Sequence, residues 1–152
     1  MRRGARNHDG QLSLPGVGAL PNKLLRPKGA KGGAHGRLVS AIIEWSELPT
    51  IARLLVLTRT PAGLFVLRGR GVVRGAKAGT SDITGRTTDG RVVAIEVKVG
   101  RDTLRADQRV YLQGVIRDNG WAFVARSIEQ ISREVHEAFA GRYVPSAEIF
   151  AA

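Results

Sequence analysis

The stretch from Arg91 to Val99 constrains the fold of this chain more than any other. Nearly every position in it is apolar or β-branched until Glu96 and Lys98 interrupt the run. A strand that is apolar on both faces needs cover on both, which predicts a sheet with helices packed on its faces. Because side chains alternate along a strand, Glu96 and Lys98 share one face. Buried charges are costly unless they are paired or bind a metal, so this pair indicates chemistry.

A hairpin before this strand brings Asp82 to the same place. If Thr88-Asp89-Gly90 forms a three-residue loop with a left-handed glycine, Thr87 pairs with Arg91 and Asp82 falls opposite Glu96. A two-residue Asp-Gly turn would shift the pairing by one and send Asp82 to the other face. We predict the three-residue loop, or a bulge of the same parity. Taken alone, the resulting cluster also fits an ordinary surface salt bridge at a strand end.

The charge of the chain favours a polyanionic partner. It has 24 Lys and Arg against 13 Asp and Glu, a formal net charge of +11 and a pI near 11.3, so nucleic acid ranks ahead of membrane surfaces. The absence of cysteine excludes disulfides, thiol catalysis and Cys-bound zinc. No apolar run approaches ~20 residues, and the start lacks the apolar core of a signal peptide. We expect a cytoplasmic protein that does not enter the membrane.

Composition divides the chain into three parts. Residues 1–36 are rich in Gly, Lys, Arg and Pro without periodicity, and we expect a flexible basic arm that either lies on phosphates or only aids solubility. Residues 37–140 form the predicted domain, and residues 141–152 form a tail. The glycine clusters of the arm lack a following Gly-Lys-Ser/Thr, so no nucleotide cofactor is expected.

The periodicity predicts the order helix, hairpin, short strand, central strand, helix, strand, helix. The expected elements are the helix Arg37–Leu48, ended by Pro49, the hairpin of Arg53–Thr60 with Leu64–Arg68, the helix from Asp102 or Thr103 to about Asp118, the strand Trp121–Arg126 and the helix Ile128–Phe139. The stretch from Leu48 to Ser81 has six basic residues and no acid. Within it, Gly69 to Gly79 is expected to be a loop that a ligand can approach closely.

One polar residue interrupts the apolar stripe of the helix after the central strand. By helical spacing the stripe is Leu104, Gln108, Tyr111, Leu112 and Val115. A buried amide must find partners, and site carboxylates, a water or a phosphate oxygen could supply them. The alternative is a Gln at the rim of the stripe.

Four ordered blocks carry a resemblance to a known family. They are Ala78–Gly85, Gly90–Lys98, Asp107–Leu112 and Gly120–Ser127. In these blocks the chain resembles the VRR-NUC family of the PD-(D/E)XK nuclease superfamily, over about Arg37 to Ile131. The resemblance implies a restriction-endonuclease-like α/β core, αβββαβ with a C-terminal helix. It also implies a divalent-metal endonuclease that hydrolyses DNA, often branched DNA such as Holliday junctions, in phage or bacterial replication, recombination or repair. Stand-alone members tend to be homodimers.

The resemblance assigns roles to residues. Asp82 and Glu96 match the metal-binding carboxylates, Lys98 matches the lysine that positions or activates water, and Gln108 matches the glutamine of the following helix. We predict Mg²⁺, for which Mn²⁺ substitutes, held by the two carboxylates and the carbonyl of Val97, because hard cations prefer oxygen ligands.

The chain departs from the family pattern at two places. Ser81 stands where the superfamily has proline, which leaves the following acid in place. The family often has a glutamate early in the first helix, and here His35 falls near that position, with Glu44 and Glu47 two or three turns later. We keep Glu44 as a further candidate. The three histidines lack metal-ligand spacing, and we expect each to be incidental.

Basic residues around the expected site are predicted to hold DNA phosphates. They are Arg68, Arg70, Arg74, Lys77, Arg109 and Arg126. Two rival functions stay open at this point. One is a non-catalytic basic protein that binds DNA or RNA, and the other is a nuclease for RNA or for one duplex sequence.

Overall fold

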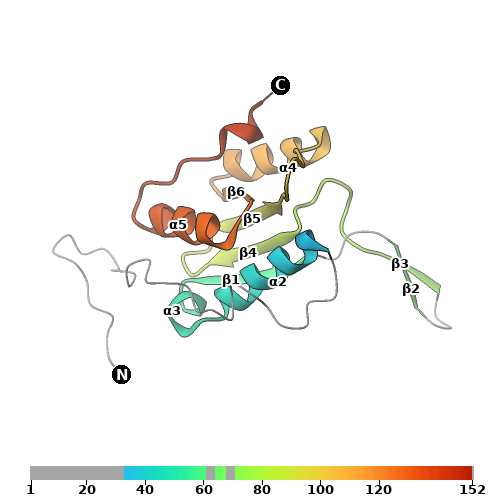
Figure 1. The fold of residues 1–152 in the computed structure, drawn as a ribbon, viewed down its shortest axis with the longest axis horizontal. Helices are drawn as coiled ribbons and strands as arrows, with labels where there is room; N and C mark the ends of the chain where they lie inside the picture. The colour runs from blue at the N-terminus through green and yellow to red at the C-terminus, as the bar shows by residue number, and fades with distance from the viewer. Residues whose placement is uncertain (1–32, 61–63, 68–70, 152) are drawn as a thin grey trace.

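The chain builds an α/β fold in which helices cover both faces of a small mixed sheet. The computed structural model describes residues 33–60, 64–67 and 71–151, and Figure 1 shows the arrangement. The elements are α2 (Ala34–Ser46), α3 (Pro49–Ala52), β1 (Leu55–Arg59), β2 (Leu64–Leu67), β3 (Gly71–Arg74), β4 (Ile83–Thr87), β5 (Val92–Val97), α4 (Ala106–Arg117), β6 (Trp121–Ala125), α5 (Ile128–Phe139) and the short 3₁₀ helix η1 (Ala147–Ile149).

The main sheet has four strands in the order β1-β4-β5-β6. The first three are antiparallel, and β6 runs parallel to β5 after a crossover through α4. Apart from the separate β2–β3 ribbon, the order is helix, three strands, helix, strand, helix. This agrees with the expected element order and with the expected helix-flanked mixed sheet.

The predicted register of the central hairpin is confirmed. Ile83 pairs with Ile95, and the main-chain N–H of Thr87 donates to the carbonyl of Arg91 at 2.9 Å. The loop therefore has three residues, and Gly90 closes it at φ +86°, a left-handed conformation that glycine adopts without strain. Counting back from this pairing places Asp82 opposite the glutamate of β5.

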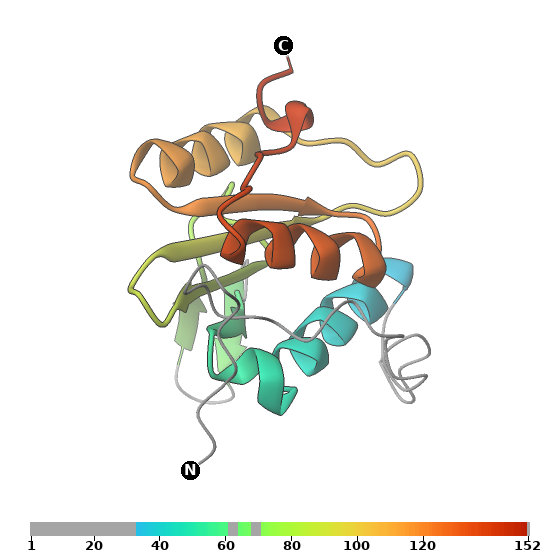
Figure 2. The same ribbon diagram turned by 90° about the vertical axis from the view of Figure 1, so that its left-hand side faces the viewer.

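Each face of the sheet has its own apolar core. Alternate β5 residues, such as Val93 and Ile95, pack with α2 and α5. Ala94, between them, faces the other way and packs with Leu112 of α4 and Ile149 of η1. Figure 2 shows the resulting layers, with α4 on one side of the strands and α2 and α5 on the other. The strand is thus covered on both faces, as its apolar sequence requires.

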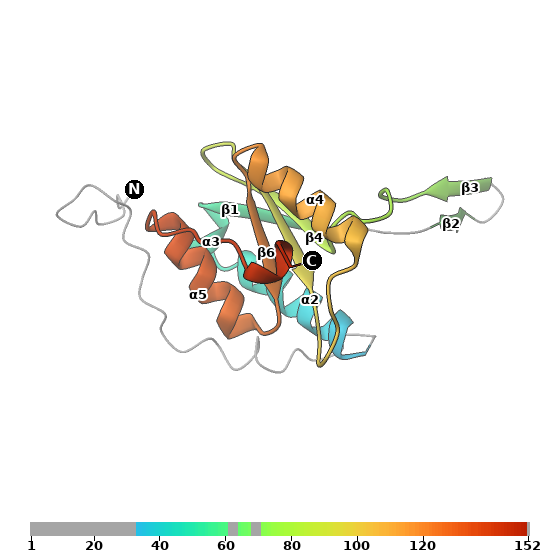
Figure 3. The same ribbon diagram turned by 90° about the horizontal axis from the view of Figure 1, so that it is seen from above.

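The expected hairpin of Arg53–Thr60 with Leu64–Arg68 is wrong. β1 pairs with β4 instead, and β2 pairs with β3, so part of the expected glycine loop is a strand. Pairing with β4 buries Leu55 of β1 in the core. It is possible because Gly85 has no side chain: a Cβ there would lie 2.1 Å from the carbonyl oxygen of Val56. The β2–β3 ribbon projects away from the main sheet (Figure 3).

The first helix begins earlier and ends earlier than expected. α2 starts at Ala34, so the last residues of the predicted 1–36 arm belong to the domain; residues 1–32 lie outside the described residues. Pro49 begins α3 rather than ending α2, since proline fits the first turn of a helix, where its missing N–H is not needed.

The C-terminal tail is a packed part of the domain. Ile149 is fully buried, and the hydroxyl of Tyr143 bonds both main-chain groups of Ala122 on β6, at 2.8 and 2.9 Å. The side-chain amide of Gln130 reaches the same strand at the carbonyl of Val124. Side chains therefore satisfy the outer edge of β6. Among the described residues, no helix has the length and apolar character needed to cross a bilayer.

Candidate active site

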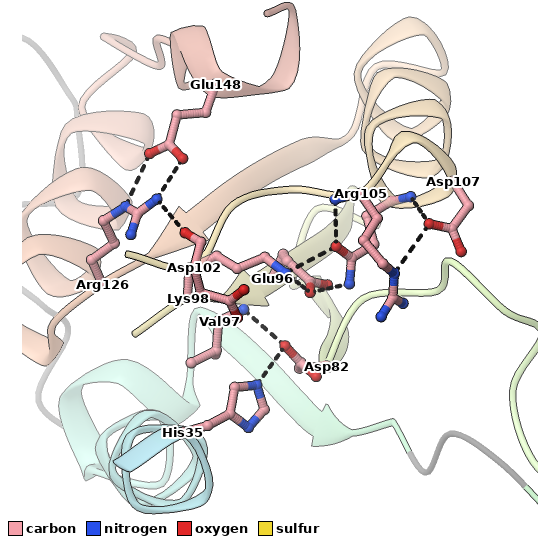
Figure 4. A network of polar contacts seen from close by, with 11 residues as sticks. His35, Asp82, Glu96, Val97, Lys98, Asp102, Arg105, Asp107, Arg126 and Glu148 are labelled. Carbon is pink, nitrogen blue, oxygen red and sulfur yellow. Dashed lines mark hydrogen bonds and ion pairs between the residues drawn. The ribbon is translucent and has the colours of Figure 1, made fainter. Parts of the chain in front are cut away.

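The C-terminal end of β5 opens into a hollow of about 860 Å³. Its walls come from four parts of the chain: the start of α2, the segment before β4, the end of β5 and the segment that leads into α4. The lining residues that matter below are His35, Lys77, Gly79, Asp82, Glu96, Val97, Lys98, Arg105 and Gln108. The predicted catalytic residues therefore meet at one place (Figure 4).

Glu96, Lys98 and Gln108 form a buried network on the face that the sequence predicts. The Lys98 ammonium lies 3.2 Å from Glu96 Oε1 and donates to Gln108 Oε1 at 2.9 Å. The Gln108 amide nitrogen donates in turn to Glu96 Oε1. Only 2% of the Glu96 side chain and 5% of the Lys98 side chain are exposed. Of the alternatives left open for Gln108, the structure shows a buried amide that contacts a site carboxylate. The burial of Glu96 and Lys98 excludes an ordinary surface salt bridge.

One oxygen of Glu96 has no partner. Oε2 is buried and makes no hydrogen bond in the structure. Loss of hydration raises the pKa of the Glu96 carboxyl to about 7, and the charge of Asp82 acts in the same direction, while Lys98 opposes both. A buried carboxylate oxygen without a donor is costly. A cation bound at this oxygen would remove that cost.

The two oxygens of Asp82 differ in the same way. Oδ2 accepts the main-chain N–H of Val97 at 2.9 Å and lies 3.1 Å from Nε2 of His35. Both hydrogen bonds of the Asp82 carboxylate within the described residues go to this oxygen, so Oδ1 is left for a ligand. The carboxylate is thus fixed in position from β5 and from α2.

A left-handed glycine fixes the wall beside α4. Gly79 has φ +87°, and a Cβ there would lie 2.9 Å from the main-chain oxygen of Asp107. The main chain before β4 therefore packs directly on the first turn of α4. Lys77, exposed on this segment, and Arg105, the exposed N-cap residue of α4, add positive charge to the same wall.

The donor set fits a hard divalent cation. Within the described ranges, no group of three or more His, Cys, Asp or Glu side chains could hold a metal by itself. Mg²⁺ is typically held by one or two carboxylates together with waters and substrate oxygens. The unpartnered Glu96 Oε2 and the free Asp82 Oδ1 match that demand, and Val97 lines the same hollow.

Two of the predicted DNA contacts are engaged within the fold. Arg126 donates to both carboxylate oxygens of Glu148, at 3.1 and 2.7 Å, and to the carbonyl of Asp102. Arg109 donates to the carbonyl of Glu148 at 3.4 Å. These contacts hold η1 against the body, so both arginines have structural partners where we had expected only phosphates.

The four remaining predicted DNA contacts lie in different parts of the chain. Lys77 lines the hollow, where its predicted role is possible. Arg74 is the last residue of β3, while Arg68 and Arg70 lie outside the described residues.

Glu44 does not join the site. It lies nine residues beyond His35 on α2, which is about 13 Å at 1.5 Å per residue, and it does not line the hollow. The expectation that every histidine is incidental is wrong for His35, which contacts Asp82. Spacing gave no sign of this contact. The one sequence signal was that His35 aligns near the first-helix glutamate of the resembled family. Arg105 lines the hollow but was not among the site residues predicted from the sequence.

Two comparisons with known proteins find no relative. No protein-family model matches this chain, and a search of curated proteins finds no match. The geometry of the hollow therefore carries the functional argument.

Proposed function

We propose that this protein is a divalent-metal-dependent endonuclease of the PD-(D/E)XK type, similar to the VRR-NUC family, that hydrolyses DNA phosphodiester bonds. The observation that carries the proposal is the meeting of Asp82, Glu96 and Lys98 in one hollow, with an unpartnered buried oxygen on Glu96. A non-catalytic basic protein has no need of such a costly arrangement.

Each residue has a distinct part in the proposed reaction. Asp82 and Glu96 would hold Mg²⁺ or Mn²⁺, which when bound supplies Lewis acidity toward the phosphate. Lys98 orients the attacking water or offsets charge on the phosphate. Gln108 bonds both Lys98 and Glu96 and so fixes their relative position. In the hydrolysis, the water oxygen forms a bond to phosphorus, the bond to one sugar oxygen breaks, and a water proton ends on that leaving oxygen.

His35 is a positioning residue in this proposal. Its imidazole contacts Asp82 Oδ2, the oxygen that the main chain of Val97 also holds. The other oxygen is thereby directed to the cation. Fixing a carboxylate before the substrate binds reduces the reorganisation that the reaction requires.

Charge supports a nucleic acid substrate. The formal net charge is +11, and the exposed basic side chains of Lys77 and Arg105 line the hollow. Affinity should therefore fall steeply with salt, with little contribution from base edges. Branched DNA as the preferred substrate, a homodimer as the active form and a role in recombination or repair belong to the same proposal, on the resemblance alone.

The decisive experiment measures cleavage by the purified protein on duplex, flap, four-way-junction and single-stranded DNA and on RNA. Each substrate is tested with Mg²⁺, with Mn²⁺ and with EDTA. We expect cleavage of DNA with either cation and none with EDTA. The variants are Glu96→Gln and Lys98→Ala, with Glu129→Gln and Arg133→Ala on exposed positions of α5 as charge-matched controls.

The site variants should lose cleavage and keep most of their DNA affinity, while the controls should cut normally. If Lys98→Ala cleaves DNA at the wild-type rate, this hollow is not the active site. DNA binding without scission under any cation would favour the non-catalytic alternative. Cleavage of RNA but not of DNA would show that RNA is the substrate in place of DNA. Sedimentation of the protein with and without junction DNA tests the homodimer.

A further inference from the structure

The basic side chains of the hollow are of two kinds, one buried and the others exposed. Among the described residues, the Lys and Arg side chains that line it are Lys77, Lys98 and Arg105. Only 5% of the Lys98 side chain is exposed, and its ammonium already contacts Glu96 Oε1 and Gln108 Oε1. Lys77 and Arg105 are exposed. Two of the three N–H groups of Lys98 are thus directed to protein oxygens, and a phosphate in this hollow requires a further donor.

The main chain of Arg105 is tied to the buried network. Gln108 Oε1 accepts the main-chain N–H of Arg105 at 3.0 Å, and the same oxygen accepts from the Lys98 ammonium at 2.9 Å. The preceding residue, Leu104, is buried in the core on the α4 side of the sheet. The start of α4 therefore has a fixed position relative to Lys98 and Glu96.

The side chain of Arg105 is held only weakly. Its Nε lies 3.4 Å from Asp107 Oδ1, and 68% of the Arg105 side chain is exposed. The same oxygen of Asp107 also accepts the main-chain N–H of Gln108 at 3.0 Å. Exposed ion pairs of this kind contribute little to stability, so a ligand can replace Asp107 as the partner of the guanidinium at small cost.

The charge of Arg105 acts on the carboxylates of the site. Burial and the charge of Asp82 raise the pKa of Glu96, whereas the charges of Lys98 and Arg105 oppose this rise. Figure 4 shows Arg105 beside Glu96 and Lys98. A planar guanidinium presents paired N–H groups that match two oxygens of a phosphate, which a single ammonium does not.

We propose that Arg105 is a further catalytic residue, whose guanidinium donates to the non-bridging oxygens of the phosphate that is cut. This inference rests on the proposed function, since it takes that phosphate to lie at Asp82 and Glu96. In the transition state negative charge is spread over these oxygens, and a donor already in place stabilises it without reorganisation. Lys98 is then left for the attacking water, and Asp107 holds the guanidinium beside the hollow until substrate binds.

Two variants of Arg105 and one matched control test the proposal. Arg105→Ala removes the guanidinium, and Arg105→Lys keeps the charge without the paired N–H groups. Arg117→Ala is the control, because Arg117 makes the same kind of contact at the other end of α4. Its Nε lies 3.4 Å from Asp118 Oδ1, and 78% of its side chain is exposed. Arg117 does not line the hollow. Thermal unfolding should show a similarly small change of Tm in the two alanine variants.

The first readout is kcat with Mg²⁺ on the DNA that the wild type cuts best. Loss of one donor to charge that develops in the transition state costs about 100-fold or more in kcat, and we expect this for Arg105→Ala. Arg105→Lys should recover part of the loss, because it restores the charge but not the geometry. Arg117→Ala should change kcat by less than about twofold, as for an exposed ion pair elsewhere on the surface.

A second readout separates contact with the phosphate from a merely structural effect. Sulfur replaces one or the other non-bridging oxygen of the phosphate that is cut, and rates are measured in Mn²⁺. Sulfur is a poorer hydrogen-bond acceptor than oxygen, so the isomer with sulfur at Arg105 should slow the wild type and slow Arg105→Ala much less. Arg117→Ala should respond to both isomers as the wild type does. Equal sulfur effects in Arg105→Ala and the wild type would overturn the contact.

A third readout tests the contact without cleavage. The affinity of the full chain for fluorescein-labelled DNA is measured by anisotropy over a range of salt concentrations, with Ca²⁺ in place of Mg²⁺ so that binding is measured apart from cleavage. Loss of one phosphate contact removes about 0.9 from the slope of log K against log salt. We expect this change for Arg105→Ala and not for Arg117→Ala.

The outcomes separate this inference from the proposed function. If the wild type cuts DNA and Arg105→Ala has the same kcat as Arg117→Ala, the role of Arg105 is wrong and the nuclease proposal stands. If no cation supports cleavage but Arg105→Ala alone lowers the salt slope, the phosphate contact stands, while the nuclease proposal and the catalytic role of Arg105 are wrong. If no cation supports cleavage and the two alanine variants bind DNA alike, or if the wild type binds no DNA, both proposals are wrong.

Discussion

Replacing Glu96 by glutamine should make the metal-free protein more stable at pH 8, although it removes a residue of the proposed active site. The Glu96 side chain is buried, and one of its oxygens has no hydrogen-bond partner. Its pKa rises from 4.5 to about 7 because burial removes hydration and because Asp82 is nearby. Glutamine keeps the shape of the side chain and one oxygen that can accept from Gln108 and Lys98, without the charge.

The sign of the effect follows from proton binding. The folded state holds the Glu96 proton more tightly than the unfolded state, so the carboxyl does not destabilise the fold below pH 4.5. Between pH 4.5 and about 7 the unfolded state ionises first, and stability falls; above pH 7 the loss is complete. At about 1.4 kcal/mol per pKa unit, the full loss is about 3 kcal/mol. For a domain of this size that corresponds to about 10 °C in Tm.

Urea unfolding in EDTA at pH 4, 6 and 8 measures the difference between Glu96→Gln and the wild type. The difference should be near zero at pH 4 and should grow to about 3 kcal/mol in favour of the variant at pH 8. Mg²⁺ should reduce this difference in unfolding free energy, because it stabilises only the wild type. Glu148→Gln is a control of opposite sign, because Arg126 lowers the pKa of Glu148 and its removal should cost less than about 1 kcal/mol at pH 8. A variant less stable than the wild type at pH 8, or a difference independent of pH, would refute the reasoning.

Three further substitutions test the neighbouring contacts. His35→Ala removes one of the two donors to Asp82, and we expect kcat to fall about tenfold, the equivalent of one charged hydrogen bond, with a smaller change in KM; equal effects on both constants would count against a positioning role. Gly79→Ala puts a methyl group 2.9 Å from the oxygen of Asp107 at φ +87°, and should lower the free energy of unfolding by about 1–2 kcal/mol and raise KM. Tyr143→Phe removes two hydrogen bonds to the outer edge of β6 and should cost about 1–3 kcal/mol in urea unfolding.

The parts of the fold that local chemistry decides could be predicted from the sequence. The loop that ends at Gly90 sets the parity of the hairpin, and this parity places Asp82 opposite Glu96. Helical spacing placed Gln108 in the stripe that faces the sheet, where it is buried. In each case the controlling residues lie close together in the chain.

Partner choice between distant segments could not be predicted in the same way. β1 pairs with β4 across the β2–β3 ribbon, because that pairing buries its leucines in the core, and no local turn signal encodes it. The carboxylate that Arg126 binds belongs to Glu148, which is 22 residues away in the sequence. The contact of His35 with Asp82 spans 47 positions and shows only once α2 is packed on the sheet.

The hydrogen bonds from Tyr143 and Gln130 to β6 decide where the sheet can grow. Another strand cannot add beside β6 without first displacing these side chains, so an incoming chain would have to extend the sheet past β1. Removing residues 141–152 would therefore change the edge of the sheet as well as the C-terminus. It would leave the N–H and the carbonyl of Ala122 without partners on the outer edge of β6, and aggregates that form through that edge should appear.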